Sequence, residues 1–316
     1  MFRVLSIDGG GIKGIFAVSF LSAIEAITGK RVADHFDLIA GTSTGGIIAL
    51  GLGLGYTPAE LLAFYRDEGK AIFPDEGTLS RAARWTRHLL RVAYSPRALE
   101  AALRNRFGSR RLGESARRLV IPAFDAVRGD VHVYKTAHHP RLKTDYRVEA
   151  WQVAMATASA PTYFPCYVTA EGSSLIDGGV WANNPAMVAL TEAVAVLKVP
   201  LDSISMLSIG TTVAPVSVGR TRRTSGGRLL WASTAPALLL HGQSLAASNQ
   251  TELILGRERF LRINPVVQPG RYGLDDVRAA EELVGVGQSV ARIEGEQIEQ
   301  RFLTTPAEAF VPSHHL

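Results

Sequence analysis

Two short glycine-rich stretches, DGGGIKG at residues 8–14 and GTSTG at residues 41–45, decide how this chain is expected to fold. Each follows an apolar run, 4–7 in the first case and 36–40 in the second, and each precedes a segment with apolar residues at helical spacing. A strand, a tight turn and a helix are therefore predicted twice in succession. In neighbouring parallel strands both turns would lie at the same edge of the sheet, where open α/β folds place their sites.

The alternation of strands and helices continues along the chain. Further strands are predicted at 119–124, 131–135, 174–176 and 204–209, and further helices at 57–69, 149–160 and 185–197. A polar stretch at 214–228 is expected to be an exposed loop or lid. The pattern predicts an α/β fold with three layers (α/β/α) and a mainly parallel central sheet. We expect a single domain over 1–316, with a motif-bearing core at about 3–210 and a helical C-terminal extension at about 228–316.

The second turn presents a serine in the pattern Gly-x-Ser-x-Gly, formed by Gly41, Ser43 and Gly45. Glycines on both sides relieve steric crowding at a sharp turn between a strand and a helix, which leaves the serine oxygen exposed at the helix N-terminus. Because the strand, the turn and the helix are all predicted here, we expect Ser43 to be a nucleophile. The competing interpretation is an ordinary turn whose serine caps the helix.

A serine nucleophile needs hydrogen-bond donors for the negative charge that develops when it attacks a carbonyl group. Gly9, Gly10 and Gly11 can supply them, because successive backbone N–H groups without side chains can converge on one point. We expect these glycines to form an oxyanion hole. Lys13 either adds positive charge to this hole or is solvated.

The first turn also has a competing interpretation. Gly9, Gly11 and Gly14 match the spacing of the dinucleotide-binding fingerprint, but that motif requires an acidic residue at the end of the second strand. Here the second strand ends in the turn that carries Ser43, and Asp37 lies in or before the strand. A membrane- or nucleotide-binding module without catalytic activity remains the alternative that is not an enzyme.

The serine also needs a base, and the histidines of the chain stand in no distinctive local pattern. Asp177 follows a short apolar run and precedes Gly178 and Gly179, so its carboxylate is expected at a strand end where the backbone turns sharply. Partial burial would raise its pKa towards that of a general base, which makes a dyad of Ser43 and Asp177 chemically feasible. The chain order of Ser43, Asp177 and His241 leaves a triad of the α/β-hydrolase type as the alternative.

Composition excludes several classes of protein. A single cysteine, Cys166, rules out an internal disulfide and a cysteine-bound metal cluster, and it fits a reducing, cytosolic setting. We expect no metal and no cofactor. Because no apolar run forms a secretory signal or reaches the length of a membrane-spanning segment, we expect a cytoplasmic protein that is at most peripheral at the inner membrane face.

Positive charge is concentrated in one segment. Residues 81–118 contain eleven arginines and two acidic residues, although the net charge of the whole chain is only +5. Three interpretations stay open for this segment: a solvated helical face, a patch that contacts the membrane surface, or a site for an anionic ligand or a protein partner. The candidate contacts are Arg81, Arg84, Trp85, Arg87 and Arg91. No nucleic-acid recognition module is evident, so DNA is not an expected partner.

Four stretches together resemble the patatin-like phospholipase family. They are DGGGIKG at 8–14, GTSTG at 41–45, ATASAPTYFP at 156–165 and DGG at 177–179. The resemblance implies a lipid acyl hydrolase that cleaves fatty-acyl esters of membrane phospholipids or lysophospholipids with a Ser-Asp dyad and without a metal. At the matching positions it implies Ser43 as nucleophile and Asp177 as base. The family often has arginine at the position of Lys13, which keeps the charge but differs in hydrogen-bonding geometry.

The length and the lack of a secretion signal are also similar to those of bacterial patatin-like effectors that degrade membrane lipid during anti-phage defence, some of which respond to cyclic dinucleotides. This similarity implies a phospholipid membrane surface as partner, a cyclic nucleotide or another anion as activator, and a homo-oligomer as one expected state of assembly.

Overall fold

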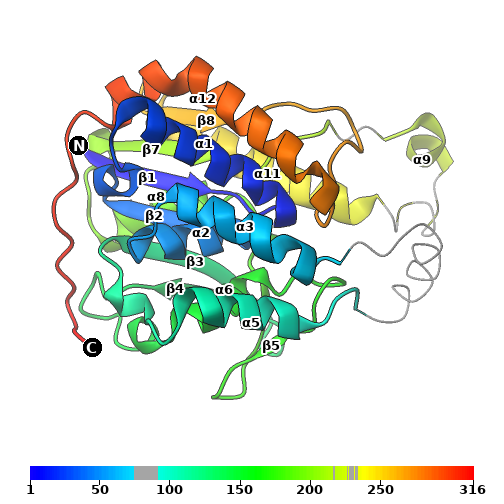
Figure 1. The fold of residues 1–316 in the computed structure, drawn as a ribbon, viewed down its shortest axis with the longest axis horizontal. Helices are drawn as coiled ribbons and strands as arrows, with labels where there is room; N and C mark the ends of the chain where they lie inside the picture. The colour runs from blue at the N-terminus through cyan, green and yellow to red at the C-terminus, as the bar shows by residue number, and fades with distance from the viewer. Residues whose placement is uncertain (75–91, 216–217, 226, 228–230, 232–233) are drawn as a thin grey trace.

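The computed structural model describes residues 1–316 except 75–91, 216–217, 226, 228–230 and 232–233. Within the described residues, eight strands form one sheet in the order β5-β6-β3-β2-β1-β7-β8, with β4 also paired to β3. The strands are β1 (Phe2–Ile7), β2 (Leu38–Gly41), β3 (Arg118–Asp125), β4 (Asp130–Lys135), β5 (Tyr167–Val168), β6 (Ser174–Asp177), β7 (Ile204–Ile209) and β8 (Phe260–Ile263). Helices cover both faces of this sheet (Figure 1), so the three-layer α/β/α architecture is confirmed.

The helices fall mostly where the apolar spacing predicts them. They are α1 (Gly14–Thr28), α2 (Thr44–Gly53), α3 (Pro58–Ile72), α5 (Pro96–Phe107), α6 (Ala150–Ala158), α7 (Gly179–Ala182), α8 (Ala186–Thr191), α9 (Arg220–Ser225), α11 (Ala235–Leu255) and α12 (Ala280–Phe302). A short 3₁₀-helix, η1 (Gly11–Lys13), precedes α1, and a π-helical turn, η5 (Glu192–Val196), continues α8. The stretch at 214–228, expected to be a loop, contains the short helix α9.

Alternate residues of the central strands supply two cores, one on each face of the sheet. Leu5 of β1 and Ile39 of β2 are fully buried in the larger core, which also contains side chains of α1, α2, α3 and α12. Their neighbours Val4 and Leu38 are fully buried in the smaller core beneath α8 and the end of α11. Burial on both faces explains why these strands are apolar throughout rather than alternating.

The sheet is mixed, because β4, β5 and β6 are antiparallel to their neighbours while β1, β2, β3, β7 and β8 are parallel. β2 and β6 pair with the same edge of β3, β2 through Ala40 and Val120 and β6 through Asp177 and Ala123. β4 takes the opposite edge. The carboxyl ends of β2 and β6 therefore face each other along β3. This arrangement brings the turn after β2 to the end of β6.

The last third of the chain is less uniformly helical than expected. Between the helices α11 and α12, β8 joins the central sheet and pairs parallel to β7. The extension at about 228–316 therefore contributes a strand to the same sheet that carries the glycine-rich turns.

One helical stretch, Gly11–Thr28, is long and apolar enough to span a bilayer when judged by length and composition alone. Most of it is α1, whose side chains Phe16, Phe20 and Ile24 are fully buried in the larger core. α12 packs closely against it, since a Cβ at Gly287 would lie 2.8 Å from the carbonyl oxygen of Phe16. The apolar character of this stretch is explained by its place as a core helix of the fold.

Candidate active site

The structure brings Ser43 and Asp177 together. The Ser43 hydroxyl donates a hydrogen bond of 2.6 Å to Oδ2 of Asp177, although the two residues are far apart in the sequence. Ser43 is 9% exposed and Asp177 is 5% exposed, so the pair lies at the margin of the protein interior. A hydroxyl held this close to a carboxylate is poised to lose its proton to it.

The turn that presents Ser43 depends on glycine at two positions. A Cβ at Gly41 would lie 2.1 Å from the carbonyl oxygen of Gly45, and one at Gly45 would lie 2.3 Å from that of Ile7. Ser43 itself has a φ of 56°, a left-handed conformation that is strained for a residue with a side chain. This conformation is typical of a nucleophile at a sharp turn between a strand and a helix, and α2 begins at the next residue.

Thr157 supports this turn, and no inference from the sequence assigned it a role. Its hydroxyl accepts a hydrogen bond of 3.0 Å from the Ser43 N–H and donates one of 2.6 Å to the carbonyl oxygen of Pro122. Proline has no N–H, and Pro122 lies in the part of β3 between its pairings with β2 and β6. Thr157 belongs to the ATASAPTYFP stretch at 156–165, so the sequence identifies the motif but not the contact of Thr157 with Ser43.

The environment of Asp177 suits a general base. Burial raises the pKa of its carboxyl from the ordinary 3.8 to about 6, while the hydrogen bonds from Ser43 and from the Gly179 N–H oppose that rise. The Gly179 bond to Oδ1 is 2.7 Å long, so each carboxylate oxygen has one donor. The tight turn needs glycine next to Asp177, because a Cβ at Gly178 would lie 2.3 Å from the Pro122 carbonyl oxygen.

The triglycine turn lies beside Ser43, but its three amides are not equivalent. A Cβ at Gly9 would lie 3.2 Å from Cβ of Ser43, so the turn packs directly against the serine. The Gly9 N–H, however, donates to the carbonyl oxygen of Asn183 at 2.9 Å and is not free to bind an oxyanion. Within the described part of the chain, the N–H groups of Gly10 and Gly11 have no such partner. The Gly9 N–H is therefore used within the fold, whereas those of Gly10 and Gly11 stay available for the oxyanion hole that the sequence predicts.

Lys13 lies at the end of η1 and is half-buried. Burial lowers the pKa of its ammonium group, and the nearby Asp8 carboxylate partly opposes this effect. Lys13 is therefore not a fully solvated side chain, and its charge acts within the region of the triglycine turn.

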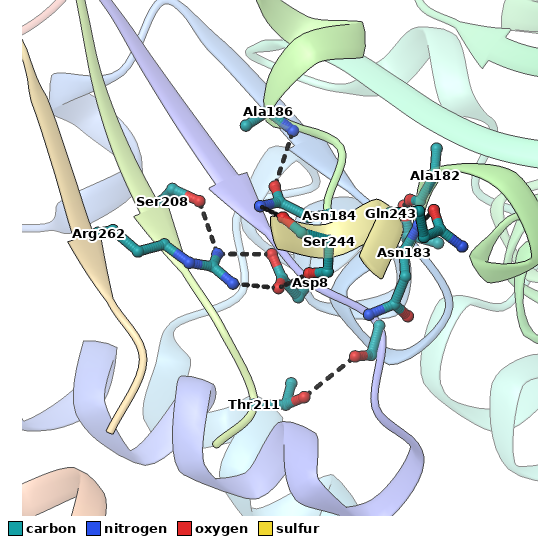
Figure 2. Close-up of polar contacts among 12 residues, drawn as sticks. Asp8, Ala182, Asn183, Asn184, Ala186, Ser208, Thr211, Gln243, Ser244 and Arg262 are labelled. Carbon is teal, nitrogen blue, oxygen red and sulfur yellow. Dashed lines mark hydrogen bonds and ion pairs between the residues drawn. The ribbon is translucent and has the colours of Figure 1, made fainter. Parts of the chain in front are cut away.

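Asp8 anchors the triglycine turn from the other side. The Arg262 guanidinium of β8 donates to both carboxylate oxygens of Asp8, at 2.8 and 2.5 Å, and also to the Ser208 hydroxyl of β7 (Figure 2). The Ser244 hydroxyl of α11 donates to Oδ2 of the same carboxylate over 3.4 Å. Asp8 and Arg262 are 4% and 17% exposed at their side chains, so this is a largely buried ion pair. No local pattern marked Arg262, because nothing in its sequence neighbourhood shows which buried carboxylate it faces.

Two alternatives from the sequence do not match the geometry. The first is the triad with His241. Gln243 of α11 faces the site. Because an α-helix turns by about 100° per residue, His241, two residues earlier, lies on the opposite side of α11.

The second alternative, the dinucleotide fingerprint, fails for a different reason. The first turn is covered by the carbonyl oxygen of Leu274, which accepts from the Ile12 N–H and would lie 2.2 Å from a Cβ at Gly11, where φ is +57°.

Some expected contacts cannot be placed. The candidates Arg81, Arg84, Trp85, Arg87 and Arg91 lie outside the described residues. Among the residues that are described, no group of three or more histidine, cysteine, aspartate or glutamate side chains could hold a metal ion.

Comparison with known proteins places the chain among proteins of similar sequence. A family model described as patatin-like phospholipase matches residues 5–190. A cGAMP-activated phospholipase from Pseudomonas aeruginosa is 30% identical over 306 residues, which cover 96% of this chain and 90% of that protein. Another from Escherichia coli is 36% identical over 222 residues, which cover 66% of this chain and 62% of that protein. A solved structure, VipD from Legionella pneumophila, shares 14% identity over 90% of this chain and 66% of its own, with a TM-score of 0.43.

Proposed function

Because the chain belongs to the patatin-like phospholipase family and is a lipid ester hydrolase, we propose that it cleaves fatty-acyl esters of membrane phospholipids or lysophospholipids with a dyad of Ser43 and Asp177. The observation that carries this proposal is the 2.6 Å hydrogen bond from the Ser43 hydroxyl to a buried carboxylate. The other oxygen of that carboxylate accepts a hydrogen bond from the Gly179 N–H, so a backbone donor rather than a histidine contacts the base.

The reaction follows from these positions. Asp177 takes the proton of the Ser43 hydroxyl while Oγ attacks the ester carbonyl carbon, and the carbonyl oxygen becomes an oxyanion near the N–H groups of Gly10 and Gly11. When the C–O bond to the leaving alcohol breaks, the protonated Asp177 returns the proton to that alcohol. A water molecule then attacks the carbonyl carbon of the acyl-serine while Asp177 accepts its proton. The C–O bond to Ser43 breaks, the fatty acid leaves, and Asp177 returns the proton to Oγ of Ser43.

The raised pKa of Asp177 supports this role. A carboxylate with an ordinary pKa is a poor proton acceptor for a hydroxyl group, whereas a pKa of about 6 brings the base nearer to neutral pH and still leaves it ionised there. The triad with His241 is the weaker proposal, because that histidine lies on the side of α11 away from Gln243 and the site.

Contact with a lipid surface is proposed from α11. The helix has no aspartate, glutamate, lysine or arginine between 235 and 251, and Leu239, one turn before Gln243, is 71% exposed. Val180, next to Gly179, is 41% exposed. A helical stretch without aspartate, glutamate, lysine or arginine that exposes leucine beside an ester-cleaving site fits contact with the apolar part of a bilayer surface, at the cytoplasmic face.

The cGAMP-activated phospholipases that resemble this chain support a proposal about control. We propose that a cyclic dinucleotide raises the activity of this enzyme, as expected of an effector in bacterial anti-phage defence.

The proposed function is tested by measuring fatty-acid release from phospholipid vesicles for the wild type and Ser43→Ala, with and without cGAMP. We expect Ser43→Ala to lose about a thousandfold or more in rate under both conditions, because the nucleophile is gone. Ser289→Ala, an exposed serine of α12, is the matched control and should behave as the wild type. Undiminished activity of a Ser43→Ala protein of the same purity as the wild type would refute the dyad.

A further inference from the structure

Two parts of the site come from segments far apart in the chain and must keep a fixed distance. The oxyanion turn begins at Gly9, after β1, and the loop of the base runs from Asp177 to Asn183, after β6. They touch directly through the Gly9 N–H and the Asn183 carbonyl oxygen at 2.9 Å. A single hydrogen bond between two turns leaves room for relative movement, and catalytic rates fall steeply when such groups move by about 1 Å.

Gln243 of α11 binds the loop of the base at two points with both ends of its amide group. Its Nε2 donates to the carbonyl oxygen of Gly179 at 2.6 Å, and its Oε1 accepts from the N–H of Asn183 at 3.1 Å. Figure 2 shows Gln243 beside Asn183, with Ser244 near Asp8. The two backbone polar groups of Gly179 have different partners. Its carbonyl oxygen accepts from Gln243, and its N–H donates to the Asp177 carboxylate.

We infer that Gln243 is a positioning residue for the acyl-transfer reaction: its amide clamps the loop that carries Asp177 and holds it in register with the oxyanion turn. This inference rests on the proposed function of Ser43 and Asp177. It assigns a task to a residue that belongs to no recognised motif and lies beyond the 5–190 region that the family model matches.

The neighbouring contacts make α11 well suited to this task. Ser244, the next residue, contacts Asp8 through its hydroxyl, and its carbonyl oxygen accepts from Asn184 at 3.2 Å. Two successive residues of α11 therefore reach the segment before the oxyanion turn and the end of the base loop. Because α11 directly precedes β8 in the chain, the clamp comes from the region that follows the motif-bearing core.

The test uses Gln243→Met, which keeps the length and volume of the side chain and removes both hydrogen bonds. Gln250→Met, an exposed position of the same helix, is the matched control. We expect kcat on a soluble short-chain ester to fall about tenfold or more while KM changes less than about twofold, because the groups that act in the transition state lose their alignment.

The pH profile separates positioning from a general structural effect. Wild-type kcat/KM should fall as the pH drops through about 6, where Asp177 becomes protonated. The groups that act on this carboxylate are the Ser43 hydroxyl, from the turn before α2, and the Gly179 N–H, at the start of α7, and both favour its ionised form. If Gln243→Met loosens the Gly179 peptide, the acidic limb should move upward by about half a pH unit.

A further variant and a further measurement keep the inference open to refutation. Gln243→Glu retains the acceptor for the Asn183 N–H but turns a carboxylate oxygen towards the Gly179 carbonyl oxygen, so its kcat should fall at least as far as that of Gln243→Met. Amide hydrogen exchange at 8–11 and 177–184 should be faster in Gln243→Met than in Gln250→Met, and this measurement needs no enzyme activity.

The outcomes distinguish this inference from the proposed function. An unchanged kcat, or unchanged exchange at both loops, in folded Gln243→Met overturns the positioning role even if Ser43→Ala is inactive. A loss that appears only in KM, with the acidic limb in place, overturns it as well. An active Ser43→Ala protein instead overturns the dyad, while the exchange measurement still decides whether Gln243 clamps the two loops.

Discussion

Asp177 meets two opposed demands at the scale of a single residue. The proposed reaction needs its carboxylate ionised next to the Ser43 hydroxyl, whereas burial favours its neutral form and raises its pKa to about 6. The folded protein therefore holds a charge that it would be more stable without. Such a cost at a functional group is a common origin of trade-offs between stability and activity.

This cost predicts that Asp177→Asn is more stable than the wild type and inactive. The carboxyl pKa is raised from 3.8 in the unfolded chain to about 6 in the fold, so the wild type loses stability as the pH rises between these values. Above pH 6.5 the full difference of about two pKa units corresponds to about 3 kcal/mol, and at pH 4.5 only about 1 kcal/mol remains. Urea unfolding of both proteins at pH 8 and pH 4.5 measures this difference. Equal stabilities at pH 8 would show that the buried charge costs nothing.

At the scale of elements, β8 and α11 hold the glycine-rich turn that precedes α1. The buried pair of Asp8 and Arg262 links β1 to β8, and the Ser208 hydroxyl of β7 lies between them (Figure 2). The turn is thus attached to two strands that follow it by some two hundred residues or more in the chain. This attachment explains how a glycine-rich loop can keep a single conformation despite its backbone freedom.

Removing one partner of this ion pair should be strongly destabilising. Arg262→Met leaves the Asp8 carboxylate buried without its counter-charge, and we expect a loss of about 3–5 kcal/mol in the free energy of unfolding. Adding Asp8→Asn should recover part of the loss, because no unpaired charge remains buried.

The control for this prediction is Arg257→Met. Arg257 pairs with Glu252 at the surface, where its side chain is 90% exposed, so its removal should cost no more than about 1 kcal/mol. Chemical denaturation of the three proteins provides the comparison. If Arg262→Met and Arg257→Met lose similar amounts, the buried pair does not stabilise the fold.

At the scale of the whole molecule, residues 235–251 of α11, which carry no aspartate, glutamate, lysine or arginine, and the site lie at the same edge of the sheet. β1 and β2 end at this edge, and the half of α11 that carries Gln243 lies over it, while the other end of α11 reaches the smaller core through Leu255. A lipid surface that contacts the exposed start of α11 would therefore be near Ser43.

A charged residue at this start should impair attack on membranes and spare attack on soluble esters. We expect Leu239→Glu to hydrolyse vesicle phospholipids about tenfold more slowly, because a carboxylate resists entry into the bilayer and the apolar contact of one leucine is lost. Hydrolysis of a soluble short-chain ester should be unchanged. Leu253→Glu, 85% exposed near the far end of the helix, is the matched control. Equal loss on both substrates, or an equal effect at Leu253, would contradict membrane contact through the start of α11.

The sequence by itself determined many of the elements and the two candidate reacting groups. Apolar periodicity and glycine turns predicted the early strands and helices, because burial and steric relief act over a few neighbouring residues. The same local chemistry singled out Ser43 and Asp177, since each stands at a strand end beside glycine.

Only the tertiary structure decided how these groups meet. The antiparallel entry of β6 along β3, the use of the Gly9 N–H by Asn183, and the contacts of Gln243 and Arg262 all join residues that are distant in the chain. Strand direction and hydrogen-bond partners depend on which surfaces are buried together, and neither composition nor spacing records that choice. The physical reason is the range of the interaction: a turn is determined by its neighbours, whereas a site held by buried hydrogen bonds exists only after the sheet has assembled.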